Sequence, residues 1–202
     1  MFEKTALPKG CVKHYIDWLD VTDEDESLDS YIERLSAQVK HKNPIFVGLS
    51  FGGIMAMELS KRYNSPKVVL VSSFRSKADL KWSLRVLLNT KSYRLIPNVE
   101  LSIVRRIVRK AYAMRSKVSE AKLLEMMGDE SPLFLRWAVK QIDEYRYDLP
   151  ESIELHSIIG DNDKLVDIWK DQSHQDIVPG GTHIAVYADA ETVNGYLGEI
   201  LG

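Results

Sequence analysis

Ser50 lies in a segment whose composition and spacing suit a nucleophile. It is the centre of Gly48-Leu49-Ser50-Phe51-Gly52, a G-x-S-x-G motif between an apolar run at 44–47 and a helical pattern from Ile54. Such a tight strand-to-helix turn strains the serine backbone, and its crowding requires glycine two residues to either side. The Phe51 N–H would then lie at a helix start, where it could stabilise an oxyanion. The alternative is a glycine-rich turn with an idle serine.

A serine hydroxyl is a weak nucleophile and needs a base to take its proton. His183 follows a short apolar segment at 175–178 and stands on the loop Pro179-Gly180-Gly181-Thr182-His183, which is rich in strand-breaking residues. We therefore expect it on a loop that leaves the last strand, and we predict it to be the base. The other histidines are less well placed, on expected strands (His14, His156), at a strand start (His174) or in a polar turn (His41).

The base in turn needs a carboxylate that fixes its tautomer. Two candidates follow the apolar segment at 153–159, in Gly160-Asp161-Asn162-Asp163. Asp161 stands directly at the strand end, where an aspartate commonly caps the N–H groups of a local turn. Asp163 lies further out on the loop and can reach back toward a histidine. We favour Asp163 as the acid and keep Asp161 as the alternative.

These motifs resemble those of the α/β-hydrolase superfamily, and more closely its small bacterial members of unassigned substrate, over nearly the whole chain. The matching segments are GLSFGG at 48–53, GDNDKLV at 160–166 and GGTH at 180–183. The resemblance implies that Ser50 is the nucleophile, Asp163 the acid and His183 the base, in the order that the family uses. It also implies an α/β fold, with a mostly parallel sheet flanked by helices and an inserted helical cap.

The chain departs from this family at its start. Family members carry, ahead of the part that Phe2 begins to match, a strand and a glycine-rich loop that supplies a second oxyanion N–H. Here Gly10 stands isolated, and neither feature is found. We expect either that the natural protein has a preceding segment, or that the sheet is rearranged and catalysis is impaired. Loss of one oxyanion donor lowers turnover by on the order of 100 to 1000-fold. Without that segment, an early strand should lie next to residues 44–49, or that edge should pair with a second copy in a homodimer.

The alternation of apolar segments predicts the elements that position these residues. We expect strands at 12–16, 45–47, 68–71, 153–159 and 175–178, and helices at 28–39, 54–62 and 192–201. A chain of 202 residues that is 45% hydrophobic fits one domain over 1–202. The segment 75–147 interrupts the alternation and holds 16 basic but only 8 acidic residues. Its apolar residues recur at helical spacing, which predicts a cap with helices at 80–88, 101–114, 120–127 and 132–145.

Composition limits the partners. Basic residues at 105–106, 109–110 and 115–117 could bind nucleic acid or a membrane surface. We favour the interpretation that they form a helix face exposed to solvent. A third interpretation is that they steer anionic acyl substrates to the protein. Neither a phosphate-loop motif nor zinc-ligand spacing accompanies them, so we expect no nucleic acid. The chain has no apolar run long enough for a membrane span and no export signal. Its single cysteine, Cys11, excludes an internal disulfide and, as a buried thiol, fits the reducing cytoplasm.

We therefore predict a cytoplasmic serine hydrolase that cleaves a small-molecule carboxylic ester or thioester. The reaction passes through an acyl-enzyme on Ser50, with the Phe51 N–H holding the oxyanion, and uses neither a cofactor nor a metal. The alternative from another functional class is a non-catalytic binding module that keeps the fold and the elbow but has an incomplete oxyanion hole.

Overall fold

A parallel four-stranded sheet forms the centre of the computed structural model, which describes residues 1–92, 118, 122, 131–171 and 173–202. The strands are β1 (Phe46–Leu49), β2 (Lys67–Val71), β3 (Glu154–Gly160) and β4 (Gln175–Val178), and they lie side by side in that order. Every neighbouring pair is parallel. All four carboxyl ends therefore lie at one edge of the sheet, where binding sites of open α/β sheets form.

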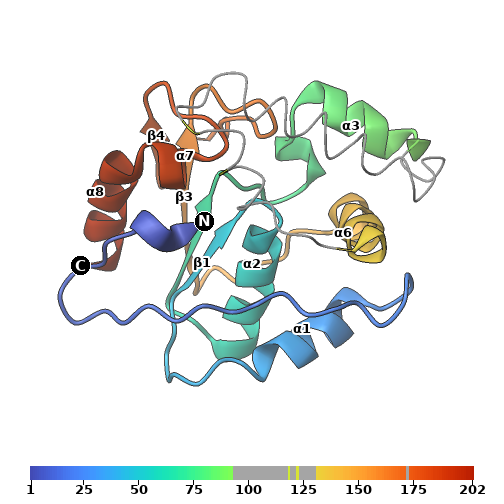
Figure 1. Cartoon of the computed structure of the whole chain (residues 1–202), viewed down its shortest axis with the longest axis horizontal. Helices are drawn as coiled ribbons and strands as arrows, with labels where there is room; N and C mark the ends of the chain where they lie inside the picture. The colour runs from blue at the N-terminus through green and yellow to red at the C-terminus, as the bar shows by residue number, and fades with distance from the viewer. Residues whose placement is uncertain (93–117, 119–121, 123–130, 172) are drawn as a thin grey trace.

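Helices cover both faces of this sheet. In Figure 1, α1 (Leu28–Ser36) and α2 (Gly52–Tyr63) lie on one side of the strands, and α7 (Ala185–Ala188) and α8 (Ala190–Leu201) on the other. Along β2, Val68 and Leu70 join the core beneath α1 and α2, whereas Val69 and Val71 join the core beneath α8. Burial on both faces explains why this strand is apolar throughout. The prediction of a mostly parallel sheet flanked by helices is confirmed.

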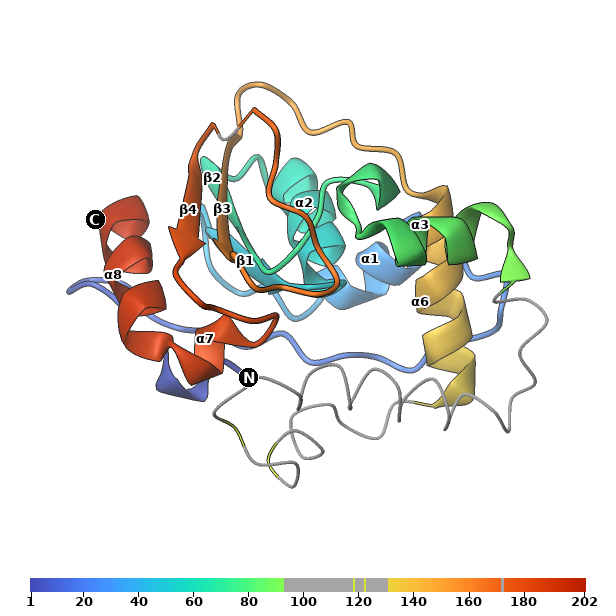
Figure 2. The same cartoon turned by 90° about the horizontal axis from the view of Figure 1, so that it is seen from above.

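Four further elements complete the described part. They are the short 3-10 helices η1 (Phe2–Lys4) and η2 (Lys77–Asp79), and the helices α3 (Trp82–Asn89) and α6 (Pro132–Glu144). Figure 2 shows α3 and α6 on the side of the sheet that α1 and α2 cover. They confirm the helices expected at 80–88 and 132–145. The helices expected at 101–114 and 120–127, and the paired basic residues, lie outside the described residues, so the cap over 75–147 stays a prediction.

The strand expected at 12–16 is wrong. Residues 7–27 contain no helix or strand and run from the α8 side of the sheet to α1 (Figure 1). The backbone of Asp17 bonds instead to the side chain of Gln38, at 2.9 Å through both its N–H and its carbonyl. Val12 is 80% exposed and the Cys11 thiol is also exposed, so the expected buried thiol is wrong too. Polar and apolar alternation alone does not make a strand, since a strand needs a hydrogen-bonded neighbour.

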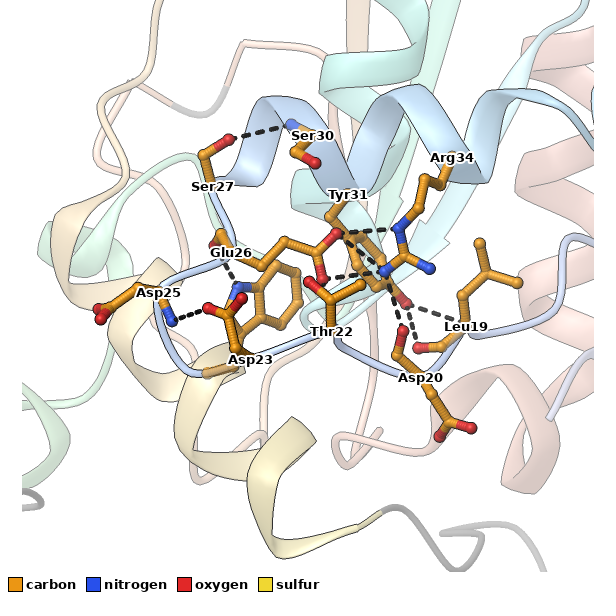
Figure 3. Close-up of polar contacts among 11 residues, drawn as sticks. Leu19, Asp20, Thr22, Asp23, Asp25, Glu26, Ser27, Ser30, Tyr31 and Arg34 are labelled. Atoms are coloured by element: carbon orange, nitrogen blue, oxygen red, sulfur yellow. Dashed lines mark hydrogen bonds and ion pairs between the residues drawn. The ribbon is translucent and has the colours of Figure 1, made fainter.

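A buried carboxylate holds this irregular segment against α1 (Figure 3). Arg34 donates to both oxygens of Glu26, each at 2.9 Å, and also to the carbonyl of Asp20. The Thr22 N–H donates to Glu26 at 2.8 Å, and the Trp137 indole N–H from α6 donates to the Glu26 carbonyl at 2.7 Å. One residue thereby ties the segment, α1 and α6 together.

No helix among the described residues combines the length and apolar character needed to cross a membrane.

Candidate active site

Ser50 stands at the sharp turn between β1 and α2. Its φ is 53°, in the left-handed region that is strained for a residue with a side chain. The Ser50 N–H donates to the Val71 carbonyl at 3.2 Å, and the Gly53 N–H donates to the Ser50 carbonyl at 2.9 Å. A Cβ at Gly48 would lie 2.2 Å from the Gly52 carbonyl oxygen, so no other residue fits there. The strained elbow expected from the sequence is therefore present.

Ser73, which was not among the predicted site residues, secures this turn. It lies just beyond β2, is fully buried, and donates from Oγ to the Ser50 carbonyl at 2.6 Å. A Cβ at Gly53 would lie 2.0 Å from the same Oγ, so the start of α2 packs directly on this serine. The contact joins segments that follow neighbouring strands. Only the pairing of β1 with β2 brings them together, and no sequence motif marks it.

Asp163 and His183 are in direct contact. The His183 Nδ1–H donates to Asp163 Oδ2 at 2.8 Å, and the two side chains are only 5% and 1% exposed. The other carboxylate oxygen, Oδ1, accepts the N–H groups of Leu165 at 2.8 Å and Val166 at 3.1 Å. These two backbone bonds fix the orientation of the carboxylate toward the imidazole.

Asp161 has a different partner. Its Oδ1 accepts the Gly180 N–H at 2.7 Å, which is the turn-capping role expected for an aspartate at a strand end. It thereby links the loop after β3 to the loop after β4. Of the two candidate carboxylates, Asp163 is the one that the structure brings to His183.

The same two loops are held together through their backbones. The Asn162 N–H donates to the Gly181 carbonyl at 2.9 Å. A Cβ at Gly160 would lie 2.1 Å from that carbonyl oxygen, so the approach of the loops depends on a glycine at this position. This close contact positions Asp163 and His183 relative to each other.

Ser50, Asp163 and His183 all lie beyond the carboxyl ends of strands, namely β1, β3 and β4. The structure brings Asp163 and His183 together, whereas contact between Ser50 Oγ and His183 Nε2 stays a prediction. Neighbouring strands lie about 4.8 Å apart, so the His183 loop must reach back across the sheet to meet Ser50.

A group able to hold a metal ion, Glu154, His156 and His174, lies at the opposite ends of β3 and β4.

Phe51 combines a backbone donor with an aromatic contact. Within the part of the chain that the structure describes, its N–H at the start of α2 donates no hydrogen bond. Its ring stacks on Trp18 of the irregular segment, with centroids 5.8 Å apart and planes at 11°, and meets the edges of Phe134 and Trp137 from α6. Trp18 is 43% exposed, so this aromatic group opens to solvent beside Ser50. This contact of Trp18 was not predicted from the sequence.

Comparison with solved structures identifies the fold. The chain superposes on a bromoperoxidase from Bacillus anthracis with a TM-score of 0.60 at 18% identity, over 84% of this chain and 72% of that one. A thermophilic esterase from Thermogutta terrifontis, with malate bound, gives 0.58 at 14% identity, over 86% and 69%. An α/β hydrolase fold protein from Burkholderia ambifaria gives 0.53 at 14% identity, over 85% and 73%.

ClbQ, from the colibactin NRPS/PKS pathway, has the highest identity of these structures, 20%, with a TM-score of 0.54 over 86% of this chain and 79% of its own. No family model matches the sequence, and no curated protein matches it. The chain therefore has the α/β-hydrolase fold, as the motifs led us to expect, and at these identities the likeness extends to the fold alone.

Proposed function

We propose that this chain, which has the α/β-hydrolase fold, is a serine hydrolase that cleaves a small carboxylic ester or thioester. The observation that carries the proposal is the buried 2.8 Å hydrogen bond between His183 Nδ1 and Asp163 Oδ2. It stands at the same edge of the sheet as the strained Ser50. A strained serine, a buried histidine and an oriented carboxylate, each after a different strand, are the parts that acyl transfer requires.

The direction of that hydrogen bond assigns the proton on the imidazole. A carboxylate only accepts, so the bond to Asp163 places a proton on Nδ1, and in the neutral imidazole the lone pair is then on Nε2. Nε2 is therefore the nitrogen that takes the proton from Ser50 Oγ as the serine attacks the carbonyl carbon. Asp163 then stabilises the imidazolium that forms, because its own orientation is fixed by two backbone N–H groups.

The developing oxyanion lies next to the Phe51 N–H at the start of α2, where a negative charge is favoured. The imidazolium returns its proton to the leaving alcohol or thiol as the tetrahedral intermediate collapses to an acyl-enzyme. A water molecule, deprotonated by His183, then attacks the acyl carbon, and the acid product leaves as Ser50 recovers its proton. The rings of Trp18 and Phe51, which pack on the buried Phe134, supply apolar surface next to the serine, and this favours an acyl group with hydrocarbon or aromatic character.

Steady-state hydrolysis of p-nitrophenyl acetate, p-nitrophenyl butyrate and an acyl thioester tests this function. Ser50→Ala should lower kcat by about 10³-fold or more, because the acyl-enzyme can no longer form. Ser30→Ala, on the exposed surface of α1, is the matched control and should leave the rate unchanged. A rate that survives Ser50→Ala would overturn the proposal. A folded wild-type protein that turns over none of these substrates would favour a non-catalytic binding module.

A further inference from the structure

Two histidines and a glutamate gather at the amino ends of β3 and β4, at the edge of the sheet opposite Ser50. Glu154 begins β3, and His156 lies two residues later on the same face. His174 directly precedes β4, whose first residue, Gln175, pairs with Ser157. The parallel register therefore places His174 beside His156. The His174 carbonyl accepts the Ser157 N–H at 2.8 Å, which fixes its backbone next to β3.

The three side chains converge. The two imidazole rings stack, with centroids 5.1 Å apart and planes at 15°, and His156 Nε2 lies 2.9 Å from Glu154 Oε1. One ligand atom from each of the three residues can be chosen so that all lie within 4.8 Å of one another. Ligand atoms held at about 2.0–2.2 Å from one tetrahedral ion are roughly 3.3 Å apart, so small side-chain rotations would complete the site.

His156 Nε2 also lacks the hydrogen bond that a buried polar atom needs. It is inaccessible to solvent and, within the described residues, makes no hydrogen bond of acceptable geometry, although Glu154 lies near. Buried polar atoms are nearly always satisfied, so an unsatisfied ring nitrogen that faces a carboxylate calls for an explanation. A cation between the two groups supplies one, and the exposure of His174 gives that cation a path from solvent.

The charges around the cluster also favour a cation. Lys67 Nζ lies 3.8 Å from Glu154 Oε2 and donates to the Ile200 carbonyl at 2.8 Å, so it balances Glu154 only in part. Two further carboxylates, Asp176 on β4 and Glu199 on α8, interact electrostatically with each other, and Asp176 also interacts with His156. A divalent ion at the cluster would add positive charge beside Glu154, which Lys67 neutralises only in part, and near Asp176.

We propose that Glu154, His156 and His174 bind one borderline transition-metal ion, with Zn²⁺ as the principal occupant and water completing the coordination. Imidazole nitrogen and carboxylate oxygen together suit Zn²⁺, whereas Mg²⁺ and Ca²⁺ prefer oxygen ligands alone. In the described residues β4 is an edge strand that pairs only with β3. The ion would therefore hold the two strands together at their amino ends. The role is structural, because the cluster lies at the opposite edge of the sheet from Ser50.

Isothermal titration of the tag-free, chelator-treated full chain with ZnCl₂ tests the proposal. We expect one equivalent to bind, and His156→Gln and His174→Asn each to weaken binding by about tenfold or more. Asparagine is chosen at position 174 because that residue has a φ of 51°, which asparagine tolerates. The matched control is His41→Ala, since His41 and His14 form another ring pair, 5.5 Å apart, around which the described residues offer no metal-binding group. This variant should bind Zn²⁺ as the wild type does.

Thermal unfolding gives an independent readout of the same ion. Saturating Zn²⁺ should raise the wild-type Tm by about 3 °C or more, because it binds only the folded strands, and should not raise that of His156→Gln. Circular dichroism of each variant without metal establishes that it is folded. A wild-type Kd weaker than about 100 µM, or wild-type affinity retained in both histidine variants, would overturn the proposal.

Discussion

The two oxygens of the Asp163 carboxylate have separate partners. Oδ1 accepts two backbone N–H groups, and Oδ2 accepts the imidazole Nδ1–H. The carboxylate of Asp161, two residues earlier in the same loop, instead accepts the Gly180 N–H on the neighbouring loop. Two aspartates that are almost equivalent in the sequence therefore differ in chemistry, because their side chains leave the loop in different directions.

Exchange of each aspartate for asparagine separates these roles. Asp163→Asn presents an amide to Nδ1 and favours the wrong imidazole tautomer, so kcat/KM for an ester should fall by about 10⁴-fold. Asp161→Asn keeps an acceptor for the Gly180 N–H and should change kcat/KM only a few-fold. If Asp161→Asn lowers kcat/KM far more than Asp163→Asn does, the assignment of the acid is wrong, although the proposed hydrolase function is still supported.

Ser73 is expected to stabilise the elbow through one buried hydroxyl. Ser73→Ala removes the 2.6 Å bond to the Ser50 carbonyl and should lower the free energy of unfolding by about 1 kcal/mol. Ser72→Ala is the matched control, because the Ser72 hydroxyl is also buried but, in the described part of the chain, has no hydrogen-bond partner. Its loss should be neutral or slightly stabilising. Urea unfolding of both variants makes the comparison, and equal stabilities would refute the role of Ser73.

At the scale of elements, the sequence predicts best where the signal is local. The strands at 68–71 and 175–178 are confirmed, because apolar runs between turn residues admit few alternatives. The strand at 12–16 is wrong: its pattern is compatible with a strand, but no strand in the described part of the chain pairs with it. Asp163 and His183 could be placed on their loops from the sequence. The contacts of Ser73 and Trp18 could not, since they depend on which distant segments the fold brings together.

The Glu26 network should make the attachment of the irregular segment sensitive to pH. Burial raises the pKa of the Glu26 carboxyl, but hydrogen bonds from the Thr22 N–H and Arg34 outweigh it, and the net pKa is lowered. A carboxyl with a lowered folded-state pKa contributes stability that is present above its unfolded pKa and lost as the pH falls through its folded pKa.

Glu26→Gln should therefore lower the free energy of unfolding by about 2 kcal/mol at pH 7, a modest value because Arg34 is partly solvated. The difference from the wild type should shrink as the pH falls below about 4, where Glu26 itself becomes protonated. Guanidinium unfolding across this range, monitored by circular dichroism, gives the comparison. A difference that is independent of pH would show that the carboxylate charge is not what holds the segment.

For the molecule as a whole, β1 forms one edge of the described sheet. Within the described residues β1 pairs with β2 alone, so early pairing by residues 12–16 is not how this edge is closed. An unpaired edge invites another chain, and the homodimer expected from the sequence stays a prediction. Light scattering on the 202-residue chain should give twice its 23.1 kDa mass, falling on dilution. A mass of one chain at every concentration would contradict the dimer.

Covalent labelling shows whether Ser50 is an activated nucleophile. A fluorophosphonate reacts with a serine only where a base and an oxyanion site assist the attack. Intact-mass spectrometry of the treated, folded protein should show one adduct, which peptide mapping locates on Ser50. The adduct should be absent in Ser50→Ala and form far more slowly in His183→Ala. A folded wild-type chain that gains no adduct, or carries it on another serine, would contradict the role of Ser50 as the nucleophile.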